Sequence, residues 1–211
     1  MTMDFFQKRG FTLIESLVAV SILTLAVAGP LFTANSAIVA AENARNQLVA
    51  SSLAQEGIEY VRWMRDNEFL AAYQTSPATA STVAWTNFMN NQPPADMSGI
   101  FHCRAPLGGP AKFCTFDPAQ GSVSPIADCP SNICSTLYLS NCTLGTGGLS
   151  CTPPNIYTQR NLTGSANTPF TRTIQAIDVS ANDERIVSTV SWSYHSTQYS
   201  VTIYDHLTPW Q

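Results

Sequence analysis

Charged side chains are scarce in this chain and are unevenly placed. Only 11% of its 211 residues are Asp, Glu, Lys or Arg, lysine occurs only at Lys8 and Lys112, and the net charge is −4. Proteins that neutralise nucleic-acid phosphates need a basic field. The composition therefore gives no indication of nucleic-acid binding. Between Phe11 and Ala41 the single charged residue is Glu15.

The sequence also lacks the common catalytic motifs. It contains no Gly-x-Ser-x-Gly, no phosphate-binding loop, no His-Glu-x-x-His and no dinucleotide-binding fingerprint. Its three histidines, His102, His195 and His206, show no recurring metal-ligand spacing. We interpret His102 as a solvated loop residue and expect no metal, no cofactor and no enzymatic activity.

Cysteine is absent outside a single stretch of the chain. No Cys-x-x-Cys pair occurs, which argues against a zinc ribbon. An even number of cysteines in a polar, Pro- and Gly-rich region is typical of disulfides formed in an oxidising compartment. The six candidates are Cys103, Cys114, Cys129, Cys134, Cys142 and Cys151. Fifteen connectivities are possible, and neighbours in sequence are favoured: Cys103–Cys114, Cys129–Cys134 and Cys142–Cys151.

A long apolar run is the strongest positive feature near the N-terminus. Residues 11–34 are long enough to span a bilayer, which needs about 20 apolar residues. A lone charge at the bilayer centre costs about 2.5–3.5 kcal/mol even on the mildest scale. Glu15 is therefore expected to act in another environment, because a segment that only crosses a membrane would do better without it.

The helical pattern continues past the apolar run. Residues 35–70 are rich in helix formers, and their apolar positions recur at three- and four-residue steps. One helix is predicted from Thr12 to about Asp66, with an amphipathic second part. Gly29-Pro30 interrupts the pattern, which predicts a kink or a stretch that can melt; a proline tolerated within a membrane helix is the alternative.

The C-terminal part has the period of two that is typical of strands. Arg172–Val179, Arg185–Tyr194 and Gln198–Tyr204 predict an antiparallel β-meander within residues 171–205. Trp192 shares a face with Ile186 and Val190 and is predicted to lie in the core. The fold class is α+β, with the long helix packed on the sheet.

The middle of the chain is harder to interpret. Residues 71–211 are predicted to form a globular head, in which Thr82–Met89 is a short helix or strand. Residues 100–152 are predicted to be cysteine-rich loops, punctuated by Pro and Gly. Crosslinks would stabilise loops that lack a core of their own.

The segment Gly10-Phe11-Thr12-Leu13-Ile14-Glu15, behind Lys8 and Arg9, resembles the processing signal of bacterial type IV pilins and of type II secretion pseudopilins. The resemblance implies that a prepilin peptidase removes residues 1–10 by cutting after Gly10 and methylates the new N-terminal Phe11. It also implies that Glu15 attracts the N-terminus of an adjacent subunit during assembly.

This resemblance implies a structural subunit, more consistent with a minor pilin or pseudopilin than with a bulk subunit. The precursor would cross the inner membrane once and then join an extracellular or periplasmic filament with other pilin subunits. Adhesion, DNA uptake, motility and secretion are all compatible, and the surface ligand is unknown.

A secreted or membrane-anchored binding protein with an ordinary signal peptide is the alternative. Ala26-Val27-Ala28 offers a cleavage site for it, but Glu15 would interrupt its apolar region. A mature N-terminus at Phe11 indicates a pilin, and one at Gly29 indicates a signal peptide.

Overall fold

The structure is a computed structural model, and it describes residues 12–90, 99–105, 112–116, 126–129, 135–140, 156–159, 161 and 165–210. The chain divides into two units, Met1–Asn46 and Gln47–Gln211. The division falls within the first helix, α1, which comprises Leu13–Thr75.

The sequence explains where α1 ends. The predicted end near Asp66 is too early, because Glu68 and Ala72 extend the buried stripe of the helix. The helix ends at Thr75, and Ser76 adopts a non-helical backbone with φ −151° and ψ 85°. Ser76 precedes Pro77, and the proline ring disfavours helical geometry in the residue before it.

The helix continues through Gly29 and Pro30 without interruption. Proline lacks the N–H that would donate to the carbonyl four residues earlier, yet the turns on both sides remain helical. An uninterrupted helix can still bend at a proline, so the predicted kink stays a prediction. No heavy atom of another part of the described chain lies within 4 Å of a Cβ placed on Gly29.

The sheet of the second unit is antiparallel and contains the predicted meander. Strand β6 pairs with β5 on one side and with β7 on the other; β5 also pairs with β1 and β3, β2 pairs with β1, and β4 pairs with β3. The strands are β1 (Cys114–Phe116), β2 (Ile126–Asp128), β3 (Thr136–Leu139), β4 (Tyr157–Thr158), β5 (Ala166–Ser180), β6 (Asp183–Tyr194) and β7 (Thr197–Leu207). The α+β prediction is confirmed.

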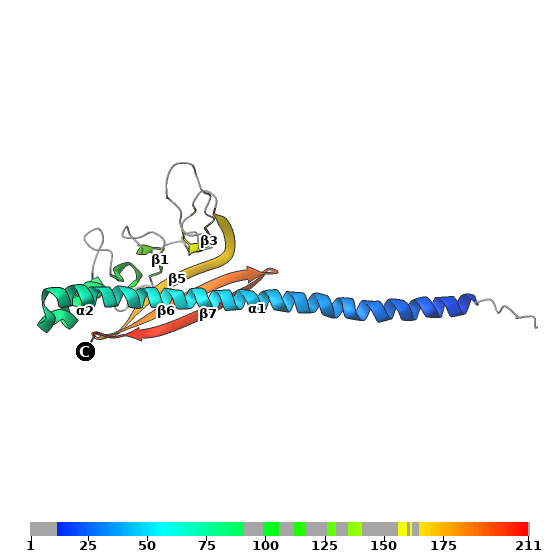
Figure 1. The fold of residues 1–211 in the computed structure, drawn as a ribbon, viewed down its shortest axis with the longest axis horizontal. Coiled ribbons are helices and arrows are strands. Elements are labelled where there is room, and N and C mark those ends of the chain that lie inside the picture. The colour runs from blue at the N-terminus through cyan, green and yellow to red at the C-terminus, as the bar shows by residue number, and fades with distance from the viewer. Residues whose placement is uncertain are drawn as a thin grey trace, which may run out of the picture. The chain divides into compact units, whose positions relative to one another are not determined.

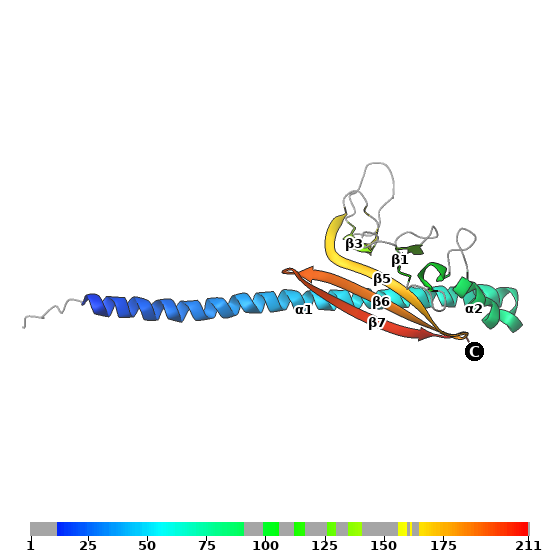
Figure 2. The same cartoon turned by 180° about the vertical axis from the view of Figure 1, so that it is seen from behind.

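The C-terminal part of α1 crosses one face of β5, β6 and β7 (Figures 1 and 2). The predicted apolar stripe of the helix is buried there: Ala50, Leu53, Ala54, Gly57, Ile58, Val61 and Met64. From β6, Ile186, Val190 and Trp192 are buried on the facing side, so Trp192 is a core residue as predicted. Burial of this apolar surface is the main stabilising term that joins helix and sheet.

Gly57 marks a very close approach between α1 and the sheet. A Cβ at this position would lie 2.5 Å from Oγ and 3.2 Å from Cβ of Ser188 on β6. Ser188 is fully buried, so its side chain has little room to move away. Only the absence of a side chain at position 57 permits this spacing.

The ambiguous segment Thr82–Met89 is helical, within α2 (Ala80–Asn90). Trp85 anchors α2 to the turn between β5 and β6, because its indole N–H donates to the carbonyl of Ala181 at 3.0 Å. Phe88 and Met89 belong to the same buried cluster as Met64 and Ile186. The head therefore contains a second helix that covers part of its core.

Candidate functional site

The beginning of α1 carries the residues that the sequence singled out. Gly10 and Phe11 lie outside the described residues. Thr12 precedes the first helical residue, and its Oγ1 accepts a hydrogen bond from the backbone N–H of Glu15 at 3.3 Å. Thr12 is thus the N-cap of the helix. The Thr-x-x-Glu spacing is that of a capping box, a local signal that the sequence analysis missed.

Glu15 itself lies in the first turn of α1 and is exposed. Its carboxylate makes no hydrogen bond or ion pair within the described residues. A negative charge in the first turn interacts favourably with the helix dipole, by about 0.3–1 kcal/mol. Glu15 therefore supports the helix start locally.

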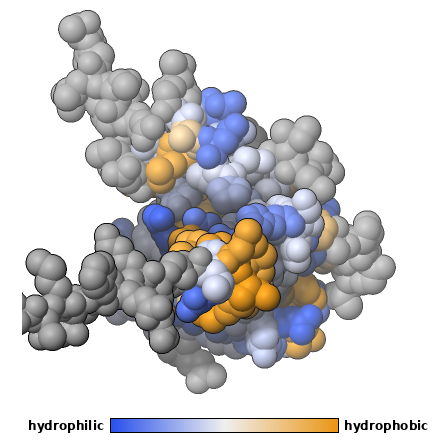
Figure 3. Space-filling view, turned by 90° about the vertical axis from the view of Figure 1, so that its right-hand side faces the viewer, coloured by the Kyte–Doolittle hydropathy of each residue, from blue (hydrophilic) through white to orange (hydrophobic). Residues whose placement is uncertain are grey.

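The apolar part of α1 presents large hydrophobic side chains on its surface, seen as orange over its first turns in Figure 3. Leu13 is 83% exposed and Phe32 is 75% exposed. Residues 12–38 are all exposed in the described structure. By length and composition α1 could cross a membrane.

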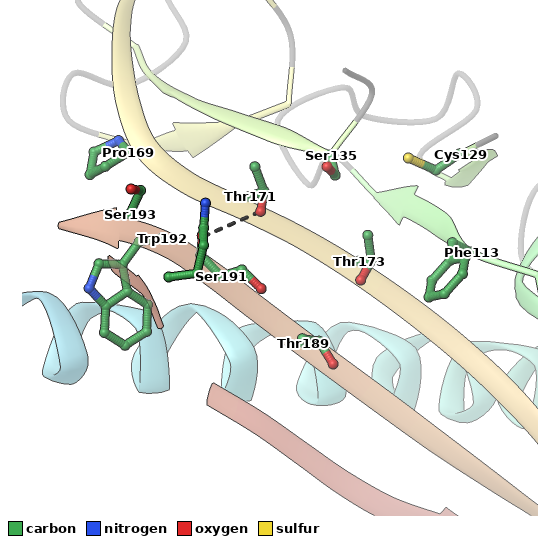
Figure 4. Close-up of a pocket in the computed structure, with 11 residues that line it drawn as sticks. Phe113, Cys129, Ser135, Pro169, Thr171, Thr173, Thr189, Ser191, Trp192 and Ser193 are labelled. Carbon is green, nitrogen blue, oxygen red and sulfur yellow. Dashed lines mark hydrogen bonds between the residues drawn. The ribbon is translucent and has the colours of Figure 1, made fainter. Parts of the chain in front are cut away.

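A groove of about 590 Å³ lies on the other face of β5 and β6, away from α1 (Figure 4). Figure 4 shows the Trp192 ring directed toward α1, while Thr171, Thr173 and Thr189 lie along the groove. The lining residues are Phe113, Cys129, Ser135, Pro169, Thr171, Thr173, Thr189, Ser191, Trp192, Ser193 and Gln198. None of these described lining residues is charged.

The cysteines follow the prediction where the structure describes them. Cys103 and Cys114 form a disulfide that joins a 3₁₀ turn, Phe101–Cys103, to β1, and both residues are fully buried. Cys129 is also disulfide-bonded. Cys134, Cys142 and Cys151 lie outside the described residues, so the two remaining pairings stay predictions.

The histidines contact carboxylates or aromatic rings. Nδ1 of His102 lies 2.9 Å from an Asp128 oxygen, and Nδ1 of His206 lies 2.9 Å from an Asp183 oxygen. His195 is in the β6–β7 turn and stacks on Tyr194. Within the described residues no group of three or more His, Cys, Asp or Glu could hold a metal ion.

A buried carboxylate lies where β6 begins. Glu184 has no exposed surface, and within the described residues its nearest cation is Nε of Arg104 at 3.6 Å. Arg104 also pairs with Asp178 at 2.9 Å. Burial raises the pKa of Glu184 to about 7; Arg104 opposes this shift, and Asp178 adds to it. Burial outweighs the arginine because the shared cation is not fully available to Glu184.

Arg172 is a buried cation that sequence analysis did not identify as structural. It is 1% exposed on β5, and its guanidinium donates to Glu56 at 2.6 Å and to the Leu53 carbonyl at 3.2 Å. The same group lies 3.9 Å from the centre of the Phe116 ring. The sequence did offer a signal for this burial: Arg172 lies two residues before Ile174, and residues two apart in a strand share a face.

Comparison with known proteins supports the N-terminal assignment. Residues 6–29 match the family described as the prokaryotic N-terminal methylation motif. No curated protein and no solved structure shows significant similarity to the chain. The motif and the apolar helix fit a membrane-anchored precursor. The chain thus carries a prokaryotic N-terminal methylation motif, which supports a prepilin of the type IV pilin or pseudopilin kind.

Proposed function

We propose that this protein is a structural subunit of a type IV pilus or of a related type II secretion pseudopilus. The observation that carries the proposal is the methylation motif at residues 6–29, joined to a helix whose exposed apolar surface holds one carboxylate, Glu15. Prepilin peptidase cuts between Gly10 and Phe11 and methylates the amine of Phe11. The protein acts by assembly and display, without catalysis.

The apolar part of α1 then serves two environments in turn. Before assembly it lies in the inner membrane, where its exposed Leu, Ile, Val and Phe side chains contact lipid. After assembly the same side chains pack against the helices of neighbouring subunits. Lipid and packed helices are both apolar, so one surface satisfies both states.

Glu15 sets the axial register between subunits. After cleavage Phe11 carries a positive amine, and opposite charges in an apolar setting attract strongly. Pairing the Glu15 carboxylate with the amine of an adjacent subunit removes the cost of leaving either charge unpaired. The lack of a partner for this carboxylate among the described residues supports this role.

The head is the displayed part of the subunit. Its buried core, its helix α2 and its buried disulfide hold the fold of the head, whose surface filament neighbours or ligands can contact. Adhesion, DNA uptake, motility and secretion are all compatible with such a display.

N-terminal sequencing of the mature protein tests the proposal. Phe11 as a methylated first residue supports it, and Gly29 as the first residue indicates an ordinary signal peptide and contradicts it. The Gly10→Val variant should remain uncut, because the larger side chain blocks the approach of the peptidase to the backbone. A product of normal mass from Gly10→Val would contradict cleavage at this bond.

A further inference from the structure

The groove on the outer face of β5 and β6 has a regular floor of hydroxyl groups. Thr171 is paired with Ser191 across the two strands, and Thr173 is paired with Thr189. Directly paired residues lie about 4.5–5.5 Å apart and project on the same side of the sheet. Ser193 extends this array along β6 (Figure 4).

Several of these polar groups are not used by the protein itself. Thr171 donates to the Ser191 carbonyl at 3.3 Å, and Thr189 shares a hydrogen bond with Thr202 at 3.1 Å. The side chains of Thr173, Ser191, Ser193 and Gln198 make no hydrogen bond within the described residues. Their hydroxyl and amide groups are available to a ligand.

The wall of the groove is hydrogen-bonded to β5 at Ser135 and within itself between Phe113 and Cys129. The backbone N–H of Arg172 on β5 donates to the Ser135 carbonyl at 2.7 Å, and that of Cys129 donates to the Phe113 carbonyl at 2.8 Å. Cys129 is also held by a disulfide. Phe113 is 44% exposed, so the fixed wall presents part of an aromatic ring. A preformed wall lowers the entropic cost of binding.

These features select a class of ligand. An ionised ligand would lose hydration without meeting an opposite charge among the described lining residues. An apolar ligand would cover the hydroxyls and leave them without hydrogen-bond partners, which is unfavourable. A peptide strand would need backbone partners, and those of β5 and β6 are paired with each other across this face. A ligand with many neutral hydroxyls and one apolar ring face avoids all three costs.

We propose that this groove binds a neutral oligosaccharide. Serine and threonine hydroxyls both donate and accept, which matches sugar hydroxyls, and the Phe113 ring contacts the apolar face of a sugar ring. The volume of about 590 Å³ lies within the range of small-ligand sites, about 300–1,000 Å³.

The test uses the full-length protein in a detergent without a sugar headgroup, so that the detergent does not compete. Saturation-transfer NMR and calorimetry are performed with maltotriose, cellotriose and triacetylchitotriose as neutral probes, and with trigalacturonate as an anionic probe. We expect saturable binding of at least one neutral trisaccharide and much weaker binding of trigalacturonate. No saturable binding of any neutral probe at millimolar concentration, or equal binding of trigalacturonate, overturns the proposal.

Matched variants locate the binding. Ser191→Ala removes a lining hydroxyl, whereas Ser200→Ala removes its direct partner on β7, which does not line the groove. We expect about tenfold weaker binding for the combined Thr173→Val and Ser191→Ala variant and unchanged binding for Ser200→Ala. Phe113→Ala, which changes an exposed side chain outside the core, should also weaken binding. Unchanged binding in both lining variants, or an equal loss with Ser200→Ala, overturns the assignment to this groove.

Discussion

The two parts of α1 use apolar residues in different ways. Before Asn46 large apolar side chains occur around the helix, and residues 12–38 are all exposed in the described structure. After Gln47 a stripe of apolar residues from Ala50 to Ala72 is buried against the head, although Leu48, Trp63 and Leu70 remain exposed. One continuous helix therefore has an exposed apolar part and a part with a buried apolar stripe.

This difference shows what a hydrophobic pattern specifies. A stripe with charged residues beside it can be satisfied within one chain, because a single neighbouring surface covers it. A helix that is apolar on all sides needs an apolar surrounding, which a small head cannot supply. The pattern thus fits the second part of α1 to folding against the head and the first part to an apolar environment such as a membrane.

The largest expected effect concerns Glu15, the one charge in the apolar part. Glu15→Ala should be cleaved and membrane-bound like the wild type, while filament yield falls to background, because the proposed intersubunit charge pair would be lost. Yield is measured by shearing filaments from cells and quantifying the subunit. If Glu15→Ala assembles as well as the wild type, Glu15 does not set the register.

Two companion variants separate charge from capping. Glu15→Gln removes the charge but keeps a capping-box residue, and Thr12→Ala removes the cap at about 1 kcal/mol while keeping the charge. We expect Glu15→Gln to fail in assembly and Thr12→Ala to assemble. The opposite pattern would assign the requirement to the helix start.

The next largest effect concerns the core that the second part of α1 forms with the sheet. Trp192→Ala should destabilise the head by about 3–5 kcal/mol, because the ring packs with Phe170, Tyr199 and the α1 stripe. Thermal unfolding in detergent measures the shift. Trp192→Phe is the control: the indole N–H has no hydrogen-bond partner among the described residues, so its removal should cost less.

The matching change in the first unit is Leu17→Ala, at a side chain that is 61% exposed. It should leave the melting temperature of the head unchanged, because Leu17 is not part of a folded core. A similar loss of stability in Leu17→Ala and Trp192→Ala would remove the proposed distinction between the two parts of α1.

A pH dependence should follow from Glu184 in the head. Its pKa is about 7 in the folded protein and 4.5 without burial, so between these values the folded state binds more protons than the unfolded state. The contribution of Glu184 to the free energy of unfolding is complete below pH 4.5. This contribution, on the order of 3 kcal/mol, is lost as the pH rises through 7. Denaturant unfolding at pH 5 and pH 8 measures this change.

Glu184→Gln is the control for the pH experiment, because the amide is neutral at every pH. This variant should show a smaller loss of stability between pH 5 and pH 8 than the wild type. An identical pH profile in the two proteins would show that another group is responsible.

The disulfide should contribute a smaller share of head stability. Replacing Cys103 and Cys114 by serine opens a loop with a sequence separation of 11 residues, which is worth about 2–3 kcal/mol in the chain-entropy model. The melting temperature of the oxidised wild type should exceed that of the variant. Alkylation of both thiols in native, freshly purified protein would contradict the presence of this bond.

The smallest expected effect concerns the β6–β7 turn. His195 and Ser196 have φ of 47° and 63°, a conformation that favours Asn and Gly in two-residue hairpins. The double variant His195→Asn and Ser196→Gly should stabilise the head by about 1 kcal/mol. Thermal unfolding checks the sign, and a lower melting temperature would indicate that stacking between Tyr194 and His195 matters more.

Local pattern was sufficient to predict α1 as far as about Asp66, the three strands of the meander and the core position of Trp192. Helical and strand periods are properties of neighbouring residues, so they can be read along the chain. The Cys103–Cys114 pair was likewise favoured by proximity in sequence. The N-cap at Thr12, with its Thr-x-x-Glu spacing, was equally local and was missed.

Tertiary structure alone decided the groove, the short strands β1 to β4 and the contacts of Arg172. Strands of two to four residues are too short to show a period, and they form because β5 and their partners provide hydrogen bonds. The groove joins Phe113, Cys129 and Ser135 to hydroxyls on β5 and β6. The register between strands and the packing of distant segments determine such sites, and neither leaves a pattern in the local sequence.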